Sequence, residues 1–175
     1  MKRTVMCVVA ALAAATGCTQ SDTSVAEPET LLVPVFASEN ARSGNYHAHA
    51  SGREEVPANN SRAQGQAMFR LSADGTELNY KLIVANIQNV TQAHIHNAPA
   101  GQNGPIVVWL YPSSPPAMLI PGRFNGELAE GVITNANVLG GMTLTQLVAL
   151  LEAGNAYVNV HTSQYPPGEV RGQIR

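Results

Sequence analysis

The sequence predicts an all-β fold, an antiparallel β sandwich or barrel with Greek-key-like connections and one short helix near residues 143–153. Short segments in which apolar and polar residues alternate recur from residue 44 onward, as expected for strands with one buried face. Clusters of proline, glycine and asparagine separate these segments, and a helical spacing of apolar residues is clear only near 143–153. Many short strands divided by regular turns favour a sandwich or a barrel.

The first predicted strands lie between residues 45 and 84. Residues 45–50 and 64–71 alternate in polarity, and Asp74-Gly75 is a strong signal for a hairpin turn. Apolar side chains then recur at every second position from Leu78 to Val84. This spacing predicts a half-buried strand that leads toward residue 91.

Residues 91–110 have the form of a strand, a glycine-rich turn and a return strand. In the first strand His94 and His96 share one face, because side chains alternate every two residues. The loop 99–105 holds two prolines and two glycines, and the apolar segment 106–110 follows it. A hairpin is therefore expected to hold the two imidazoles on one rigid strand.

The segment 111–121 contains four prolines and is expected to be a loop, because proline cannot donate a hydrogen bond within a central strand. Residues 123–128 are predicted to form a short strand. Thr143 is the expected N-cap of the helix, which Gly154 would end. Two further strands are predicted at 156–161 and 169–174.

The first 17 residues are predicted to be a lipoprotein signal peptide. Met1-Lys2-Arg3 is a basic start, and the apolar run 4–15 is too short to span a bilayer. The Gly17-Cys18 ending resembles a bacterial lipobox, so cleavage would leave Cys18 as the lipidation site; cleavage as an ordinary secretory signal is the alternative. By resemblance to lipoprotein sorting rules, Thr19 in place of aspartate favours the outer membrane, and we expect an exported, membrane-anchored protein in contact with the periplasm.

Residues 18–43 are predicted to be a flexible tether, because they are mostly polar or turn-forming. The apolar run 31–36 within it has no assigned role. Cys7 is lost with the signal peptide, so the mature chain cannot form an intramolecular disulfide. A formal net charge of -2 with 13% charged residues excludes the basic surface that nucleic-acid binding needs.

All five histidines of the chain are candidate metal ligands. An ion needs imidazole nitrogens about 2 Å away from several directions, and alternate positions on one strand face supply two of them. The preferred site is His94, His96 and His161, with His47 or His49 as a fourth ligand or a neighbouring site. Imidazole ligands without a thiolate suit copper, zinc, nickel or iron, and copper is expected, with zinc as the alternative, because the affinity order places copper above zinc. A single histidine is more often a surface or hydrogen-bonded residue, so this interpretation depends on the two His-x-His pairs.

Three polar residues are candidates for orienting the histidines. Asn159 lies two residues before His161 on the same strand face, which is expected to point away from the core together with Tyr157. Glu169 and Arg171 share a face of the last strand, where they are expected to form an ion pair or to hydrogen-bond a histidine.

Other chemistry-bearing residues have structural interpretations. Glu54 and Glu55 are interpreted as a charged turn rather than an acid–base pair, and Trp109 as a core residue. The sequence contains no nucleophile elbow, phosphate loop or dinucleotide fingerprint. No catalytic residue is therefore assigned.

Several short motifs occur in order between Tyr46 and Arg175. They are Gly52-Arg53-Glu54-Glu55-Val56-Pro57, the Ala93–His96 strand with the Gly101–Pro105 loop, Leu151–Gly154, Tyr157–Thr162 and Pro167–Ile174. In this combination residues 44–175 resemble the CHRD domain family, named for chordin. The resemblance implies an all-β domain of extracellular and bacterial exported proteins, although it does not supply the His47 and His49 pair. Locally, the histidine pattern also resembles the copper site of copper-zinc superoxide dismutase.

Three functions remain open from the sequence. The first is an exported lipoprotein that binds a transition metal, with copper as the expected ion, for storage, delivery or sensing. The second is a copper redox enzyme acting on superoxide or another small oxygen species, which needs an open coordination position. The third is a metal-free β-sandwich that binds a protein partner, as the link to chordin implies. Metal titration of histidine variants separates the third from the others, and a turnover assay separates the first two.

Overall fold

The computed structural model describes residues 44–175, so the predicted signal peptide (1–17), Cys18 and the tether (18–43) lie outside the described residues. One α-helix, α1 (Leu144–Glu152), and two short 3-10 helices accompany the strands. Within residues 44–175, no helix has the length and apolar character needed to cross a membrane. The strands are β1 (Asn45–Ser51), β2 (Gln64–Leu71), β3 (Leu78–Asn97), β4 (Ile106–Tyr111), β5 (Ile120–Ile133), β6 (Ala156–Thr162) and β7 (Val170–Gln173).

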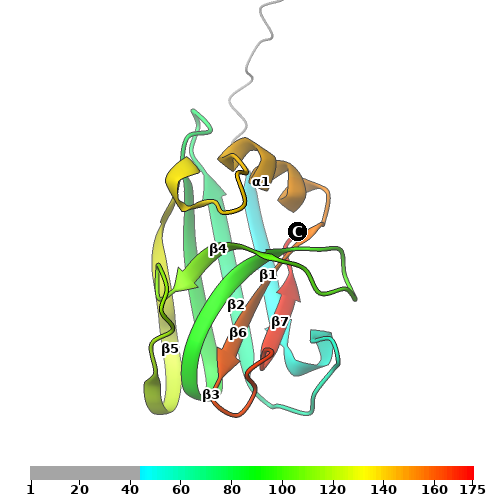
Figure 1. Cartoon of the computed structure of the whole chain (residues 1–175), viewed down its shortest axis with the longest axis vertical. Coiled ribbons are helices and arrows are strands. Elements are labelled where there is room, and N and C mark those ends of the chain that lie inside the picture. Colours follow the sequence, from blue (N-terminus) through cyan, green and yellow to red (C-terminus); the bar gives the residue numbers. More distant parts are fainter. Residues whose placement is uncertain (1–43) are drawn as a thin grey trace, which may run out of the picture. The chain divides into compact units, whose positions relative to one another are not determined.

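Five of these strands close into an antiparallel barrel (Figure 1). Their order is β2-β1-β7-β6-β3, and β2 pairs again with β3, which completes the ring. Because the ring is closed, each of the five strands is paired on both sides over at least part of its length. The ring surrounds a core of alternating apolar side chains. The predicted all-β antiparallel barrel with one short helix is confirmed.

The long strand β3 belongs to two pairs of neighbours. Its first half pairs with β2 and β5, and its second half pairs with β6 and β4. Between the halves Asn86 and Asn89 have φ angles of 56° and 52°, where the register against β5 shifts. Asparagine tolerates this left-handed conformation, and such bulges bend a strand. The strands predicted near 78–84 and 91–96 are therefore one bent strand.

The edge strand β5 is longer than the sequence predicts. It starts at Ile120, so the end of the segment 111–121, expected to be a loop, belongs to a strand. Pro121 is tolerated there because β5 pairs only with β3 and lies outside the barrel ring. The proline content gave the wrong prediction for the end of this segment, because an edge strand does not require every backbone donor.

The helix α1 lies at one end of the barrel (Figure 1) and follows its sequence signals. Thr143 Oγ1 accepts a hydrogen bond from the backbone N–H of Gln146, and Gln146 Oε1 accepts one from the backbone N–H of Thr143. This is the expected capping box. Gly154 takes a φ angle of 68° just beyond the helix end. The buried face of α1 consists of Leu144, Leu147, Val148 and Leu151.

Strand β6 is buried along its whole length. Tyr157, Asn159 and His161 alternate with the core residues of this strand, as predicted, but loops cover them. The hydroxyl of Tyr157 accepts a hydrogen bond from the backbone N–H of Gly104, and His161 bonds the carbonyl of Pro166. The face of β6 opposite the core is therefore a second, polar interior.

Candidate metal centre

Three of the five histidines form a compact buried group. His94 and His96 lie on β3 and His161 lies on its neighbour β6. One ring nitrogen from each residue lies within 4.8 Å of the others, and the residues are 0%, 7% and 6% exposed, respectively. The three residues preferred from the sequence thus come together. The group could hold a metal ion if the rings turned slightly inward, because zinc–imidazole bonds are about 2.0–2.1 Å long.

Backbone carbonyls fix the protonation of two of these rings. His96 Nδ1 lies 2.9 Å from the carbonyl oxygen of Gly104, and His161 Nδ1 lies 2.9 Å from that of Pro166. A carbonyl only accepts, so each Nδ1 carries the proton and donates it. The lone pair of each neutral ring is therefore on Nε2, and a histidine held in this way is oriented as metal ligands are.

The third ring, His94, is left with an unpartnered nitrogen. Its Nδ1 lies 3.2 Å from Nε2 of His161, and because that Nε2 carries a lone pair, Nδ1 of His94 must be the donor. Nε2 of His94 then carries a lone pair for which the described residues provide no hydrogen-bond partner. A buried polar atom without a partner costs about 1–3 kcal/mol, so the protein leaves the hydrogen-bonding capacity of this ring incompletely satisfied.

Asn159 holds the remaining ring nitrogen of His96. Its side-chain Oδ1 lies 3.0 Å from Nε2 of His96. Because Nδ1 of His96 is the protonated atom, this contact is a hydrogen bond when the amide is turned by half a turn, with its NH₂ group as the donor. The predicted role of Asn159 as an orienting residue agrees with this position.

A stack of three side chains supports His96 from one side. The rings of His96 and Tyr157 are stacked, with centroids 4.7 Å apart and planes at 5°. The guanidinium carbon of Arg171 lies 3.4 Å from the centroid of the Tyr157 ring. Arg171 also donates to Asn103 Oδ1 and to backbone carbonyls of the loop between β3 and β4. The stack therefore joins this loop to His96.

Burial keeps all three histidines neutral. Burial, with smaller contributions from the neighbouring rings of His161 and His96, lowers the pKa of His94 to about 3. Burial also lowers the pKa values of His96 and His161, against the opposing effect of their hydrogen bonds to backbone carbonyls. Neutral imidazole is the form that binds a metal ion, so the group is ready to bind at neutral pH.

The CHRD domain family matches residues 46–174 of the chain. The chain belongs to this family. The resemblance drawn from the sequence motifs is confirmed over nearly the whole described region. Neither the curated proteins nor the solved structures gave a significant match.

The CHRD domain places the other predicted site residues away from the three rings. Glu169 accepts hydrogen bonds from Ser61 and Thr162, and the partners of Arg171 are loop oxygens and the Tyr157 ring. In the described part of the chain neither residue bonds a histidine or forms the expected ion pair. His47 and His49 lie exposed on β1 and are not in the buried group. Cys18 lies outside the described residues.

Three residues near the site have surroundings that the sequence did not predict. Trp109 was expected in the core, but it is only partly buried and its ring meets His94 edge-on, with centroids 4.3 Å apart. Tyr157 was assigned no role, although its place two residues before Asn159 puts it on the histidine face. Glu55, interpreted as part of a charged turn, is 7% exposed. Burial raises its pKa to about 7, and the nearby charge of Arg171 opposes the rise.

We expect the CHRD domain in metal-free buffer to lose stability as the pH falls below about 6.5. The unfolded histidines gain protons near their ordinary pKa of 6.5, whereas folded His94 stays neutral down to about pH 3. The unfolded state therefore binds more protons, and each fully shifted group costs about 1.4 kcal/mol per pH unit. Urea unfolding at a series of pH values measures the decline.

Glu55 makes the stability depend on pH in the direction opposite to that of the buried histidines. Its ordinary pKa of 4.5 rises to about 7 in the folded domain, so its contribution is complete below pH 4.5 and is lost as the pH rises through 7. Glu55→Gln removes this contribution, and the loss of stability below pH 6.5 should become steeper. A variant whose stability does not fall on acidification would contradict the neutral buried histidines.

Proposed function

We propose that this protein is an exported CHRD-domain lipoprotein that binds one transition-metal ion through His94, His96 and His161. Copper is the proposed ion and zinc is the alternative. The proposed location is the outer membrane, with lipid on Cys18 as the anchor.

The observation that carries the metal proposal is the convergence of three buried, neutral imidazoles, with one ring nitrogen of each within 4.8 Å of the others. A histidine packed only for stability would have both ring nitrogens satisfied, as buried polar groups almost always are. Nε2 of His94 has no hydrogen-bond partner among the described residues. The hydrogen bonds to backbone carbonyls place the lone pairs of His96 and His161 on Nε2. An ion would take the place of the present donors to these atoms, Asn159 and His94. The arrangement favours a cation over a purely structural role.

The donor set supports copper. The group contains three imidazoles and no thiolate or carboxylate, and for nitrogen ligands the affinity order places copper above zinc. Three protein ligands also leave room for a further ligand, because zinc sites with three protein ligands keep an open position. A bound copper ion would supply redox chemistry there.

The binding of copper can be followed through Trp109, the single tryptophan of the chain. Its ring centroid lies 4.3 Å from that of His94, so Cu²⁺ at the buried group is expected to quench its fluorescence strongly and to saturate at one ion per chain. Zinc added first should compete, which delays the quenching. His47→Gln with His49→Gln is the matched control, and it should leave the depth of the quenching at saturation unchanged, because the outer pair is not part of the buried group. Quenching that does not saturate would count against the site.

Lipid attachment is tested on the mature protein from the native host or a related bacterium. The basic start, the short apolar run and Gly17-Cys18 support it. Mass spectrometry of the wild-type N-terminal peptide should show a diacylglycerol-modified Cys18, and Cys18→Ser should release the protein from the membrane fraction. An unmodified N-terminus at another cleavage position would refute the anchor while leaving the metal site untouched.

A further inference from the structure

A second pair of histidines lies on the outside of the barrel. His47 and His49 alternate with buried alanines on β1, and both are exposed. Side chains two residues apart on a strand point the same way, so both imidazoles face solvent over the same surface. The buried histidine group takes no residue from β1. The outer pair is therefore a separate feature of the molecule.

Met68 on β2 places a sulfur atom beside this pair. It lies directly opposite His47 in the antiparallel pairing of β1 and β2, where opposite Cβ atoms are about 4.5–5.5 Å apart. Met68 is 38% exposed, so its thioether is accessible. His47 and Met68 also line the same surface groove, which has a volume of about 780 Å³. Side chains of β1 and β2 can therefore contact the same ion.

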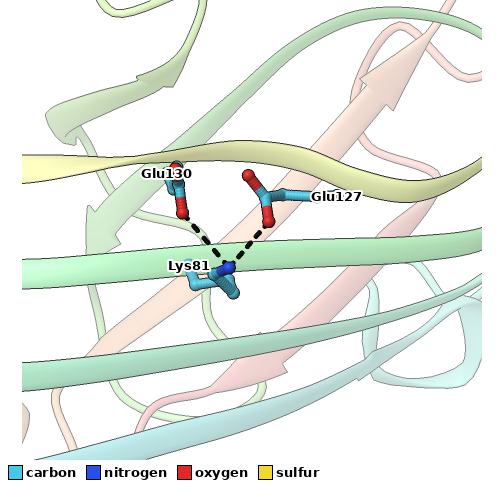
Figure 2. Close-up of polar contacts among 3 residues, drawn as sticks. All are labelled: Lys81, Glu127 and Glu130. Atoms are coloured by element: carbon cyan, nitrogen blue, oxygen red, sulfur yellow. Dashed lines mark hydrogen bonds and ion pairs between the residues drawn. The ribbon is translucent and has the colours of Figure 1, made fainter.

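The charges around Met68 do not oppose a cation. Lys81 on β3 lies opposite Met68, but its ammonium is 2.7 Å from a carboxylate oxygen of Glu127 and 3.1 Å from one of Glu130. Figure 2 shows Lys81 joined to both acids, so its charge is compensated on the β5 side. Arg70 shares the face of Met68 two residues along β2. Two carboxylates face the single ammonium of Lys81, so the four charges, including that of Arg70, sum to zero.

We propose that His47, His49 and Met68 form a second, surface metal site for monovalent copper. Thioether sulfur is a soft ligand that selects Cu(I), whereas the buried group offers nitrogen alone. The outer site is open to copper arriving from solvent. It depends on residues of β1 and β2 only, so its test is independent of the buried site.

The test is a Cu(I) titration of the purified protein without oxygen, in competition with a coloured Cu(I) chelator. The double variant His47→Gln with His49→Gln is expected to bind one Cu(I) fewer per chain than the wild type. Removing a residue that only hydrogen-bonds a metal ligand costs roughly 10- to 100-fold in metal affinity. Met68→Leu removes a ligand itself, so it should lower the affinity of the surface site for Cu(I) at least as much. X-ray absorption at the copper edge should show a sulfur neighbour in the wild type that Met68→Leu loses.

Met118→Leu is the matched control, because Met118 is also an exposed methionine, 54% exposed, in the loop before β5. It should keep both the Cu(I) affinity and the sulfur signal. All substituted side chains are exposed, so the barrel should fold normally, as circular dichroism would show. Equal Cu(I) stoichiometry in the wild type and the double histidine variant would overturn the site. An unchanged Cu(I) affinity in Met68→Leu would overturn it as well.

Discussion

Replacing His94, His96 and His161 together by alanine is expected to abolish metal binding at the buried site. Each substitution removes an imidazole whose nitrogen lies within 4.8 Å of the other two. Changing a residue that only hydrogen-bonds a metal ligand already costs roughly 10- to 100-fold in metal affinity. Loss of all three ligands should therefore leave no stoichiometric binding. Isothermal titration with Cu²⁺ or Zn²⁺ measures this, in a background of His47→Gln and His49→Gln that removes the outer pair.

A single, milder variant controls for damage to the fold. His94 is fully buried, so alanine there opens a cavity and destabilises the barrel by itself. His161→Gln keeps a polar side chain of similar size and should lower the metal affinity at least 10- to 100-fold. Circular dichroism should show the same folded barrel. If His161→Gln and the folded triple variant both bind the metal as tightly as the parent, the buried group is not the site.

Local periodicity was enough to predict part of this site. Alternation along a strand places His94 and His96 on one face whatever the rest of the fold does. Periodicity does not decide whether His161 or the pair His47 and His49 joins these two residues in the site, because every candidate is a histidine on a strand. Topology decides it: β6 pairs with the second half of β3, whereas β7 separates β1 from β6 in the ring.

The groups that orient the histidines could not be predicted from the sequence, because they are backbone atoms. The carbonyls of Gly104 and Pro166 belong to loops, and their direction depends on how each loop folds back over β6. One signal is visible afterwards: a Cβ on Gly104 would overlap the carbonyl oxygen of Asn97, so this position requires glycine. The glycine was recognised only as a turn residue, although its close approach is what brings its carbonyl to His96.

Arg171 also shows the limits of pairing rules. Its place two residues from Glu169 predicted an ion pair, but the loop between β3 and β4 folds over β7 and presents carbonyl oxygens to the guanidinium. Glu169 turns to the hydroxyls of Ser61 and Thr162. The two residues separate because each finds several hydrogen-bond partners in a loop that no local rule could place.

Arg171→Ala is therefore expected to cause the largest loss of stability of any single polar substitution considered. Arg171 is 1% exposed and donates to Asn103 Oδ1 at 3.1 Å and to the carbonyls of Gln102 and Pro99 at 2.8 and 3.3 Å. The acceptors belong to the exposed loop residues Pro99, Gln102 and Asn103, so the cost is the loss of three hydrogen bonds made by a charged group, each worth about 1.5–3 kcal/mol. We expect the free energy of unfolding to fall by roughly 3 kcal/mol or more, measured by urea unfolding.

The same variant should weaken metal binding, because the loop that carries Gly104 loses its three hydrogen bonds to Arg171 and keeps the bond from Gln173 as its attachment to β7. The carbonyl of Gly104 is then expected to hold His96 less firmly. Arg171→Lys keeps the charge but not the planar set of donors, so it should lie between the wild type and Arg171→Ala in both stability and metal affinity. Arg70→Ala, at an exposed position on β2, is the matched control and should change stability by no more than about 0.5 kcal/mol. If Arg171→Ala unfolds at the same urea concentration as Arg70→Ala, the guanidinium does not hold the loop, and the orientation of His96 must have another source.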